Sequence, residues 1–259
     1  YTLARPDPSA LWEKHLSEAE WKKADGYYER KGKSGVWHLG SQVPKEWPLS
    51  FGDLTMFVRP TSFKHVGLFP EQMPNWQWTA ECIKNAGRPV SVLNLFAYTG
   101  GATLSALHAG ASVTHIDSSK SANVWAKENI EASGLSDKSV RIITEDVLVF
   151  IKREIKRGVR YDGIIMDPPS FGHGPKNELW KIEEDFLSLM KLARELLSPQ
   201  PLFFLMSGYA AGYSSYAFAH NLAPLTEKCG GVVEHGELAL EEENSSRILP
   251  CGIYARTNF

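Results

Sequence analysis

The sequence is short of several features that would assign a protein class at once. Its 259 residues include only three cysteines, Cys82, Cys229 and Cys251, with no Cys-x-x-Cys spacing. Few, unclustered cysteines argue against a zinc site and favour a reducing compartment, so we expect a cytoplasmic protein without a metal. No apolar stretch approaches the roughly 18 residues of a membrane span, and no signal peptide is visible. We therefore expect no membrane contact.

The sequence also has no large excess of basic over acidic residues, or the reverse. The 28 lysines and arginines nearly balance 30 acidic residues, giving a formal charge of −2 and a pI near 6.5. Nucleic-acid-binding domains often exceed a pI of about 9, so any basic surface must be local. The chain starts with Tyr1 rather than methionine, and we expect that some N-terminal sequence has been removed. The oligomeric state cannot be read from these features.

The chain divides near residue 85. Six of the eight tryptophans lie before this point, among prolines and short strand-like pieces. Ser17 and Glu20 have the spacing of a capping box at a helix start, and residues 35–39 and 54–60 are typical of strands. We predict that residues 1–84 form a small α+β element that contributes to the functional cleft, and that residues 85–259 form the main domain.

Strands and helices alternate after residue 85. Strands are predicted over 89–96, 111–117, 139–143, 161–166 and 201–206, with helices over 102–109, up to 133, 147–156 and 179–197. Residues 232–240 and 253–256 are expected to close the sheet as an antiparallel pair. This rhythm predicts an α/β fold with a doubly wound, seven-stranded, mostly parallel sheet.

The first strand-to-helix connection, Phe96-Ala97-Tyr98-Thr99-Gly100-Gly101, lacks the phosphate-binding pattern Gly-x-Gly-x-x-Gly. Ala97 and Thr99 occupy the crowded positions, which disfavours a dinucleotide. The glycines still let backbone approach a ligand closely, and the following helix offers free N–H groups to an anion such as a carboxylate. The loop therefore favours S-adenosylmethionine over NAD.

Two acids follow the next two predicted strands. Asp117 is placed to accept hydrogen bonds from both hydroxyls of a ribose, although it could be a solvated loop acid or the cap of the next helix. Asp146 could accept the exocyclic amine of an adenine, with Val147 packed nearby. It is equally suited to cap the helix that follows.

The segment Asp167-Pro168-Pro169-Ser170-Phe171 follows the apolar run 163–166, a predicted buried strand. Ligands of open α/β sheets bind beyond the carboxyl ends of the strands. Two prolines stiffen the turn and remove two donors, so it presents mainly acceptors. Such a turn suits a planar group with N–H donors while Phe171 stacks on its face. Pro-Pro alone would also fit an ordinary turn.

Together these segments resemble the class I S-adenosylmethionine-dependent methyltransferases, and more narrowly the ribosomal RNA large-subunit methyltransferase family. The resemblance covers roughly residues 50–259 and rests on four blocks: 93–101, 117–119, Asn129 and 167–171. It implies S-adenosylmethionine as cofactor, RNA as substrate and partner, RNA processing as the process, and catalytic roles for Asp167, Pro168, Pro169 and Phe171. The expected cofactor contacts are Phe69, Gln72, Asn94, Phe96, Tyr98, Thr99, Gly100, Asp117, Ser118, Ser119, Asp146, Val147 and Asp167.

The sequence departs from this family in two places. Where the family has an acid, a histidine and an arginine, this chain has Glu71, Gln72 and Met73. Members that methylate cytosine C5 have a cysteine after the fifth strand, and this chain has Ser207, whose hydroxyl is a poor nucleophile without an adjacent base. A nitrogen target needs no covalent adduct, so we predict methylation of a base nitrogen.

Other functions stay open at this point. The chain could methylate an amine or amide of a protein or metabolite, or it could be an RNA-binding module that binds the cofactor without catalysis. A nicotinamide dehydrogenase is disfavoured by the missing glycines. The basic residues Lys152, Arg153, Lys156, Arg157 and Arg160 could contact RNA phosphates, but a solvated helix face explains them as well.

Overall fold

The computed structural model describes residues 1–259 except 33, 211 and 244. Its largest unit is a seven-stranded sheet in the order β13-β14-β12-β9-β6-β7-β8. In that order the strands are Val233–Glu241, Ile248–Asn258, Phe203–Gly208, Gly163–Met166, Ser91–Leu95, Ser112–Asp117 and Val140–Thr144. β12, β9, β6, β7 and β8 run parallel, whereas β14 is antiparallel to both β12 and β13. The predicted sheet is confirmed.

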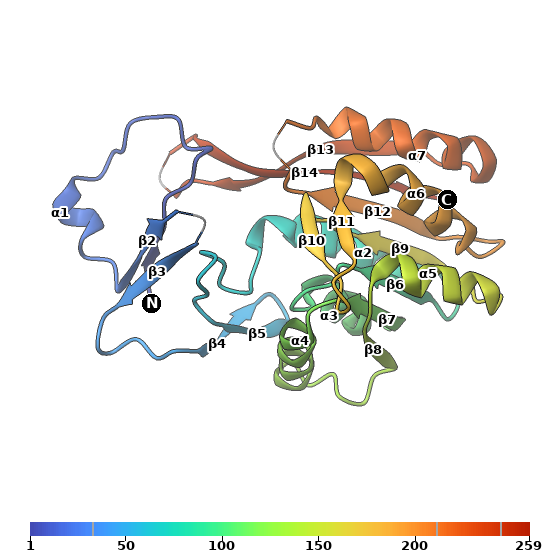
Figure 1. Ribbon diagram of the computed structural model, residues 1–259, viewed down its shortest axis with the longest axis horizontal. Helices are drawn as coiled ribbons and strands as arrows, with labels where there is room; N and C mark the ends of the chain where they lie inside the picture. Colours follow the sequence, from blue (N-terminus) through green and yellow to red (C-terminus); the bar gives the residue numbers. More distant parts are fainter. Residues whose placement is uncertain (33, 211, 244) are drawn as a thin grey trace.

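Helices cover both faces of this sheet (Figure 1). The helices that pack with one buried core are α2 (Met73–Asn85), α3 (Gly101–His108) and α4 (Lys120–Ala132), and those of the other core are α5 (Val147–Lys156), α6 (Ile182–Glu195) and α7 (Ser215–Cys229). Successive residues of one strand enter opposite cores: Ile164 packs with the α5–α7 side and Ile165 with the α2–α4 side. Parallel strands buried on both faces read as continuous apolar runs, which is why the sequence marked them clearly.

The strand order reverses between β6 and β9. From β6 the chain proceeds to β7 and β8 on one side, and it later returns to β9 and β12 on the other. Open α/β sheets bind ligands beyond the carboxyl ends of the strands at such a reversal. The fold therefore places the tips of β6 and β9 together.

Several elements differ from the expectation or were not predicted, among them α2, β4 (Trp47–Phe51) and β10 (Phe171–His173). Residues 179–181, predicted as the start of a helix, form strand β11 (Leu179–Lys181), which pairs with β10, and α6 begins at Ile182. Here exposed Leu179 alternates with buried Trp180, which is the period of a strand. The helix α7, whose span was not predicted, contains Pro224, a residue that normally interrupts helices.

The N-terminal element contains a three-stranded sheet beside the main domain (Figure 1). Its strands are β1 (Leu3–Ala4), β2 (Gly26–Lys31) and β3 (Ser34–Leu39), and its helix α1 (Glu18–Trp21) has the predicted capping box at Ser17. A hairpin of β4 (Trp47–Phe51) and β5 (Leu54–Val58) and a short 3₁₀ helix η1 (Pro70–Gln72) lead into α2. Arg247, between β13 and β14, donates to the Glu13 carbonyl at 3.0 Å and so joins the two parts. Across the described residues, none of the helices has the length and apolar character of a membrane span.

Candidate active site

The loop between β6 and α3 has an unusual backbone. Phe96 and Tyr98 have φ angles of 56° and 48°, although both carry side chains, and Gly100 has a φ of 89°. Left-handed backbone at residues other than glycine costs free energy and clusters at functional sites. At Gly100 an added Cβ would also lie 3.2 Å from Leu104 and 3.3 Å from Ala126. The loop is therefore held in a shape that an unconstrained chain would avoid.

Two buried side chains hold this loop in place. The Thr99 hydroxyl donates to the Gly67 carbonyl at 2.6 Å, and the Asn129 amide donates to the Thr99 carbonyl at 2.9 Å. Asn129 also accepts from the Phe57 N–H at 2.8 Å. Gly67 has a φ of 88°, and a Cβ there would overlap the Trp125 ring. The upstream segment is thus locked to the loop, although its role was expected only from resemblance.

Asp117 ends β7 beside this loop. Its carboxylate accepts from the Tyr98 N–H and the Ser119 N–H, each at 2.8 Å. Burial raises its pKa, and these two bonds oppose the rise. Ser119 caps α4 through the Ala122 N–H, so Asp117 is not the helix cap, and Ser118 lies half-buried between them. Each carboxylate oxygen keeps acceptor capacity for a ligand hydroxyl.

Asn94 lies one layer behind the loop. Its amide donates to the Thr103 hydroxyl at 2.9 Å, which bonds His115 at 2.9 Å, and His115 bonds Asn123 at 3.0 Å. Burial lowers the pKa of His115 to about 4, so the ring is neutral near neutral pH. Asn123 also donates to the Asp117 carbonyl at 3.1 Å. This chain of satisfied polar groups fixes the tips of β6 and β7.

Asp146 caps α5. Its carboxylate accepts from the Val149 N–H at 2.9 Å, so the capping role is confirmed, while a contact with an adenine amine stays a prediction. The next residue, Val147, is 3% exposed and packs in the core under the α5–α7 face. At the end of β8, Asp146 and Val147 therefore serve mainly to stabilise α5.

The Pro-Pro turn follows β9 and is fixed by the hairpin that sequence reasoning missed. The Pro169 carbonyl accepts from the Trp180 indole N–H at 2.6 Å, and the Ser170 carbonyl accepts from the Ile182 N–H at 3.1 Å. Trp180 also contacts Phe96, with ring centroids 5.2 Å apart. The buried Trp180 indole thus contacts both the Pro-Pro turn after β9 and the loop between β6 and α3.

Phe171 lies on β10 and is 57% exposed, with its ring edge-on to His173 at 5.2 Å. An exposed ring directly after the acceptor turn is free to stack on a planar guest. The ring centroid of Phe69 lies 5.9 Å from that of Tyr98 and 5.8 Å from that of Tyr209. Phe69 therefore lies between the loop after β6 and the end of β12.

Gln72 lies at the centre of a polar cluster beside Asp167. Its amide nitrogen donates to the Ser207 hydroxyl and the Tyr209 hydroxyl, each at 3.0 Å, and its oxygen accepts from Asn75 at 3.0 Å. Gln72 is 7% exposed, so the amide is already committed within the protein. Its predicted cofactor contact stays a prediction.

The carboxyl of Asp167 has a strongly raised pKa. Burial raises the pKa of its carboxyl to about 7, a hydrogen bond from Ser207 opposes the rise, and the charge of Glu71 adds to it. Burial likewise raises the pKa of Glu71 and of Tyr209. Sequence reasoning missed Glu71, Ser207 and Tyr209 as members of this site, although the acid at position 71 matches the family's acid. Groups with such shifts cluster in active sites.

The cysteines are not placed as nucleophiles. Ser207 and Tyr209 stand at the end of β12, where a thiol was sought, and the three cysteines are free. Burial raises the pKa of Cys82 and of Cys251 to about 11, so neither thiol ionises near neutral pH. A thiolate is the reactive form, so Cys82 and Cys251 are poor nucleophiles near neutral pH.

The basic residues on α5 are partly paired with acids. Arg153 bonds Glu145 at 3.1 Å and Arg157 bonds Glu154 at 3.1 Å. Such pairs reduce the positive charge available to a phosphate backbone. This face therefore gives little support for RNA binding.

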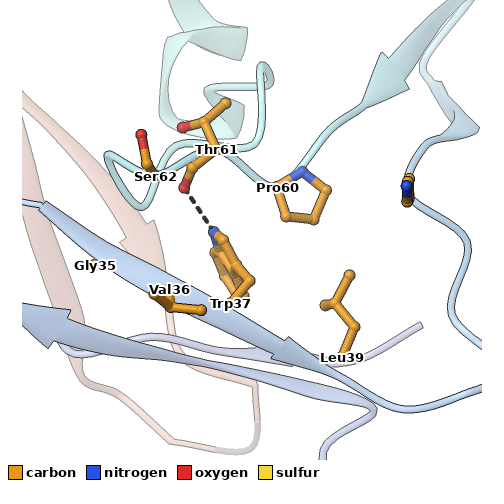
Figure 2. A pocket seen from close by; sticks show the side chains of 8 residues that line it. Gly35, Val36, Trp37, Leu39, Pro60, Thr61 and Ser62 are labelled. Atoms are coloured by element: carbon orange, nitrogen blue, oxygen red, sulfur yellow. Dashed lines mark hydrogen bonds between the residues drawn. The ribbon is translucent and has the colours of Figure 1, made fainter.

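A separate hollow lies in the N-terminal element (Figure 2). It has a volume of about 360 Å³, lies between β3 and residues 60–62, and shares none of its lining with the predicted site. The Trp37 indole N–H donates to the Thr61 carbonyl at 3.0 Å across it. That bond fastens the small sheet to the segment that leads into the cleft.

Comparisons with known proteins agree with this geometry. The profile of a family described as S-adenosylmethionine-dependent methyltransferases matches residues 30–211. A protein of Syntrophotalea carbinolica named ribosomal RNA large subunit methyltransferase K/L is 31% identical over 180 residues, 69% of this chain and 23% of that protein. One of Neisseria meningitidis named ribosomal RNA large subunit methyltransferase K is 29% identical over 185 residues, 71% and 49% of the two chains.

A solved structure is similar over nearly the whole chain. The crystal structure of a SAM-dependent methyltransferase from Agrobacterium tumefaciens has a TM-score of 0.94 and 37% sequence identity, and the match covers 99% of this chain and 84% of that one. The matches to the two curated relatives, in contrast, span 23% and 49% of their lengths.

Proposed function

Because the chain belongs to the family of S-adenosylmethionine-dependent methyltransferases, we propose that it transfers a methyl group from this cofactor to a base nitrogen of ribosomal RNA. The names of the relatives from S. carbinolica and N. meningitidis support RNA as the substrate class. The observation that carries the proposal is the turn at Asp167, Pro168 and Pro169, which follows β9 at the reversal of strand order.

The loop after β6 and Asp117, which we call the donor side of the site, fit S-adenosylmethionine, the methyl donor. Asp117 has two oxygens, each anchored by one backbone N–H, that can each accept a ribose hydroxyl. The left-handed backbone at Phe96, Tyr98 and Gly100 brings main chain toward the ligand. We assign cofactor contacts to Phe69, Gln72, Asn94, Phe96, Tyr98, Thr99, Gly100, Asp117, Ser118, Ser119, Asp146, Val147 and Asp167.

The Pro-Pro turn and Phe171, which we call the acceptor side of the site, would orient the base that accepts the methyl group. Bound S-adenosylmethionine supplies a methyl group on a sulfonium, which a neutral nitrogen can attack in line. Asp167 would accept a hydrogen of an amine, and the Pro168 carbonyl a second, because the Pro169 carbonyl is already bonded to Trp180. Phe171 would stack on the base, and such stacking contributes about 1–3 kcal/mol. The chemical step is then largely one of orientation.

The end of β12 favours nitrogen over cytosine C5. Carbon C5 becomes nucleophilic only after a thiolate adds to the ring, and the facing residue is Ser207. An amine uses its own electron pair and loses one proton, which Asp167 can accept. A ring nitrogen exposed to solvent would need no base.

The N-terminal element, residues 1–84, would complete the cleft through Phe69 and Gln72, which contact Tyr209. We place the protein in the cytoplasm, where its three free cysteines would stay reduced.

The test is incubation with ribosomal RNA that lacks its modifications and with labelled cofactor, followed by mass spectrometry of the nucleosides. We expect one base methylated on nitrogen. Labelled 5-methylcytosine would contradict the choice of atom. Label in protein or metabolites would contradict the substrate class, and binding without transfer would contradict catalysis.

A further inference from the structure

Glu71 is a buried acid for which the proposed reaction has no use. It lies in η1, is 6% exposed, and its Oε2 atom has no hydrogen-bond partner among the residues that the structure describes. A buried carboxylate oxygen without a partner costs free energy, and native structures contain few of them. An unpartnered oxygen beside the end of β12 indicates a ligand group that carries a positive charge or a hydrogen-bond donor.

Gln72 ties this acid to Asp167. Because its amide nitrogen donates to the hydroxyls of Ser207 and Tyr209, both hydroxyl hydrogens are free to point elsewhere. Ser207 follows Met206, which pairs with Met166 immediately before Asp167, and Glu71 directly precedes Gln72 in η1. The amide therefore lies between the two carboxyls.

The cluster contains little positive charge to balance the two acids. Arg5 lowers the pKa of Glu71 and Asp7 raises it, but burial has the largest effect and raises it. The remaining titratable neighbours, Tyr209 and Cys251, have raised pKa values and stay neutral. Near neutral pH two adjacent buried carboxyls cannot both ionise without cost, so the pair by itself retains a proton.

We propose that Glu71 and Asp167 together form a binding site for the positively charged part of the methyl donor, and that donor binding expels a proton from the pair. This inference rests on the family's cofactor but not on the choice of RNA. The donor carries a sulfonium and an ammonium against one carboxylate, whereas the demethylated product has lost the sulfonium charge. The pair should therefore bind the donor more tightly than the product.

The same step would prepare Asp167 for catalysis. A nearby cation favours the ionised form of a carboxyl, so donor binding leaves Asp167 able to accept the hydrogen of the target amine. When the N–C bond forms and the S–C bond breaks, the amine proton passes to Asp167. The loss of the sulfonium charge then favours the protonated pair and weakens retention of the product.

Calorimetry can count the expelled protons. Binding of S-adenosylmethionine and of S-adenosylhomocysteine is measured at about pH 7 in two buffers with different ionisation enthalpies, and the difference gives the protons released. We expect release on the order of half a proton or more with the donor, and less with the product. Release should decline as the pH rises above about 7, where Asp167 is already ionised.

Glu71→Gln keeps the shape and removes the charge. We expect it to reduce proton release and to lower the preference for donor over product by roughly tenfold, the equivalent of one pKa unit. The matched control is Glu81→Gln, an exposed position on α2, which should change neither quantity. If Glu71→Gln fails to fold, the dependence of proton release on pH in the natural protein still tests whether donor binding expels a proton.

Two outcomes would overturn the inference: donor binding without proton release, or equal release by the natural protein and Glu71→Gln. Failure of the proposed function looks different. Proton release with the donor but no methylation of RNA would reject the substrate and leave the paired site intact.

Discussion

The two sides of the cleft are stabilised in opposite ways. On the donor side, the loop after β6 and Asp117 are supported by neutral side chains whose polar atoms are bonded, such as Asn129 and His115. On the acceptor side, burial raises the pKa values of Asp167 and Glu71. Burial raises the pKa of Asp117 as well, but there two backbone N–H groups bond the carboxylate and oppose the rise.

This difference separates the part of the site that is held in one fixed geometry from the part that handles a proton. A satisfied polar network fixes one geometry and is costly to disturb, so it suits a site that must hold the same cofactor at every turnover. Carboxyls with raised pKa values change protonation near neutral pH, which suits a group that handles a proton. Mutations on the donor side should therefore reduce stability, and those on the acceptor side should reduce turnover.

The largest effect is expected at Asp167. Asp167→Asn should lower kcat by about 10²–10⁴-fold, because the amide cannot accept a proton. In the natural protein, kcat/KM should rise with pH through about 7 and then level off, since the ionised form is active. Single-turnover kinetics over a pH series measure both, and a flat profile would remove Asp167 from the proton transfer.

On the donor side, Asn129→Ala should lower the free energy of unfolding by about 2–4 kcal/mol, because it leaves the Phe57 N–H and the Thr99 carbonyl without their partner. Cofactor affinity should fall too. Ser133→Ala is the control, since Ser133 bonds only Thr55 in β5. Equal loss of affinity in both variants would contradict a specific role for Asn129. Denaturant unfolding and calorimetry give the two quantities.

The raised pKa of Asp167 also predicts how stability varies with pH. The folded protein holds this proton up to about pH 7, whereas the unfolded chain releases it near pH 4. The free energy of unfolding therefore falls as the pH rises between these values. Above this range, Asp167→Asn should raise the free energy of unfolding by about 1–3 kcal/mol relative to the natural protein. Unfolding at about pH 4 and pH 8 tests this, and a gain that is equal at both would point to another cause.

A smaller effect is expected from Trp180→Phe, which keeps the ring and removes the N–H bonded to Pro169. We expect kcat to fall roughly fivefold, since one such bond contributes about 1 kcal/mol, while cofactor affinity stays the same. Trp37→Phe removes the same kind of bond, to Thr61, far from the cleft. Loss of activity in that control as well would show that the effect is not local.

The sequence predicted the parallel strands well because each is an apolar run that ends at a polar residue, as at Asp117 and Asp167. It predicted the strand tips as the site for the same reason. It missed β11 because Leu179, Trp180 and Lys181 precede a helix without a break, and only the Trp180 bond to Pro169 shows why they extend. Glu71 and Tyr209 were missed because they are 138 residues apart in the chain, and no local pattern joins them.

The crossing of Gly67 over Trp125 limits how this chain can be altered. Because no side chain fits there and the backbone carbonyl is bonded to Thr99, the segment from Gly67 onward moves only with the main domain. Insertions are expected to be tolerated in the loops before Pro60 and to abolish cofactor retention when placed between Gly67 and Gln72. A designer who exchanges the front of this protein for another recognition module should therefore join the two before that crossing.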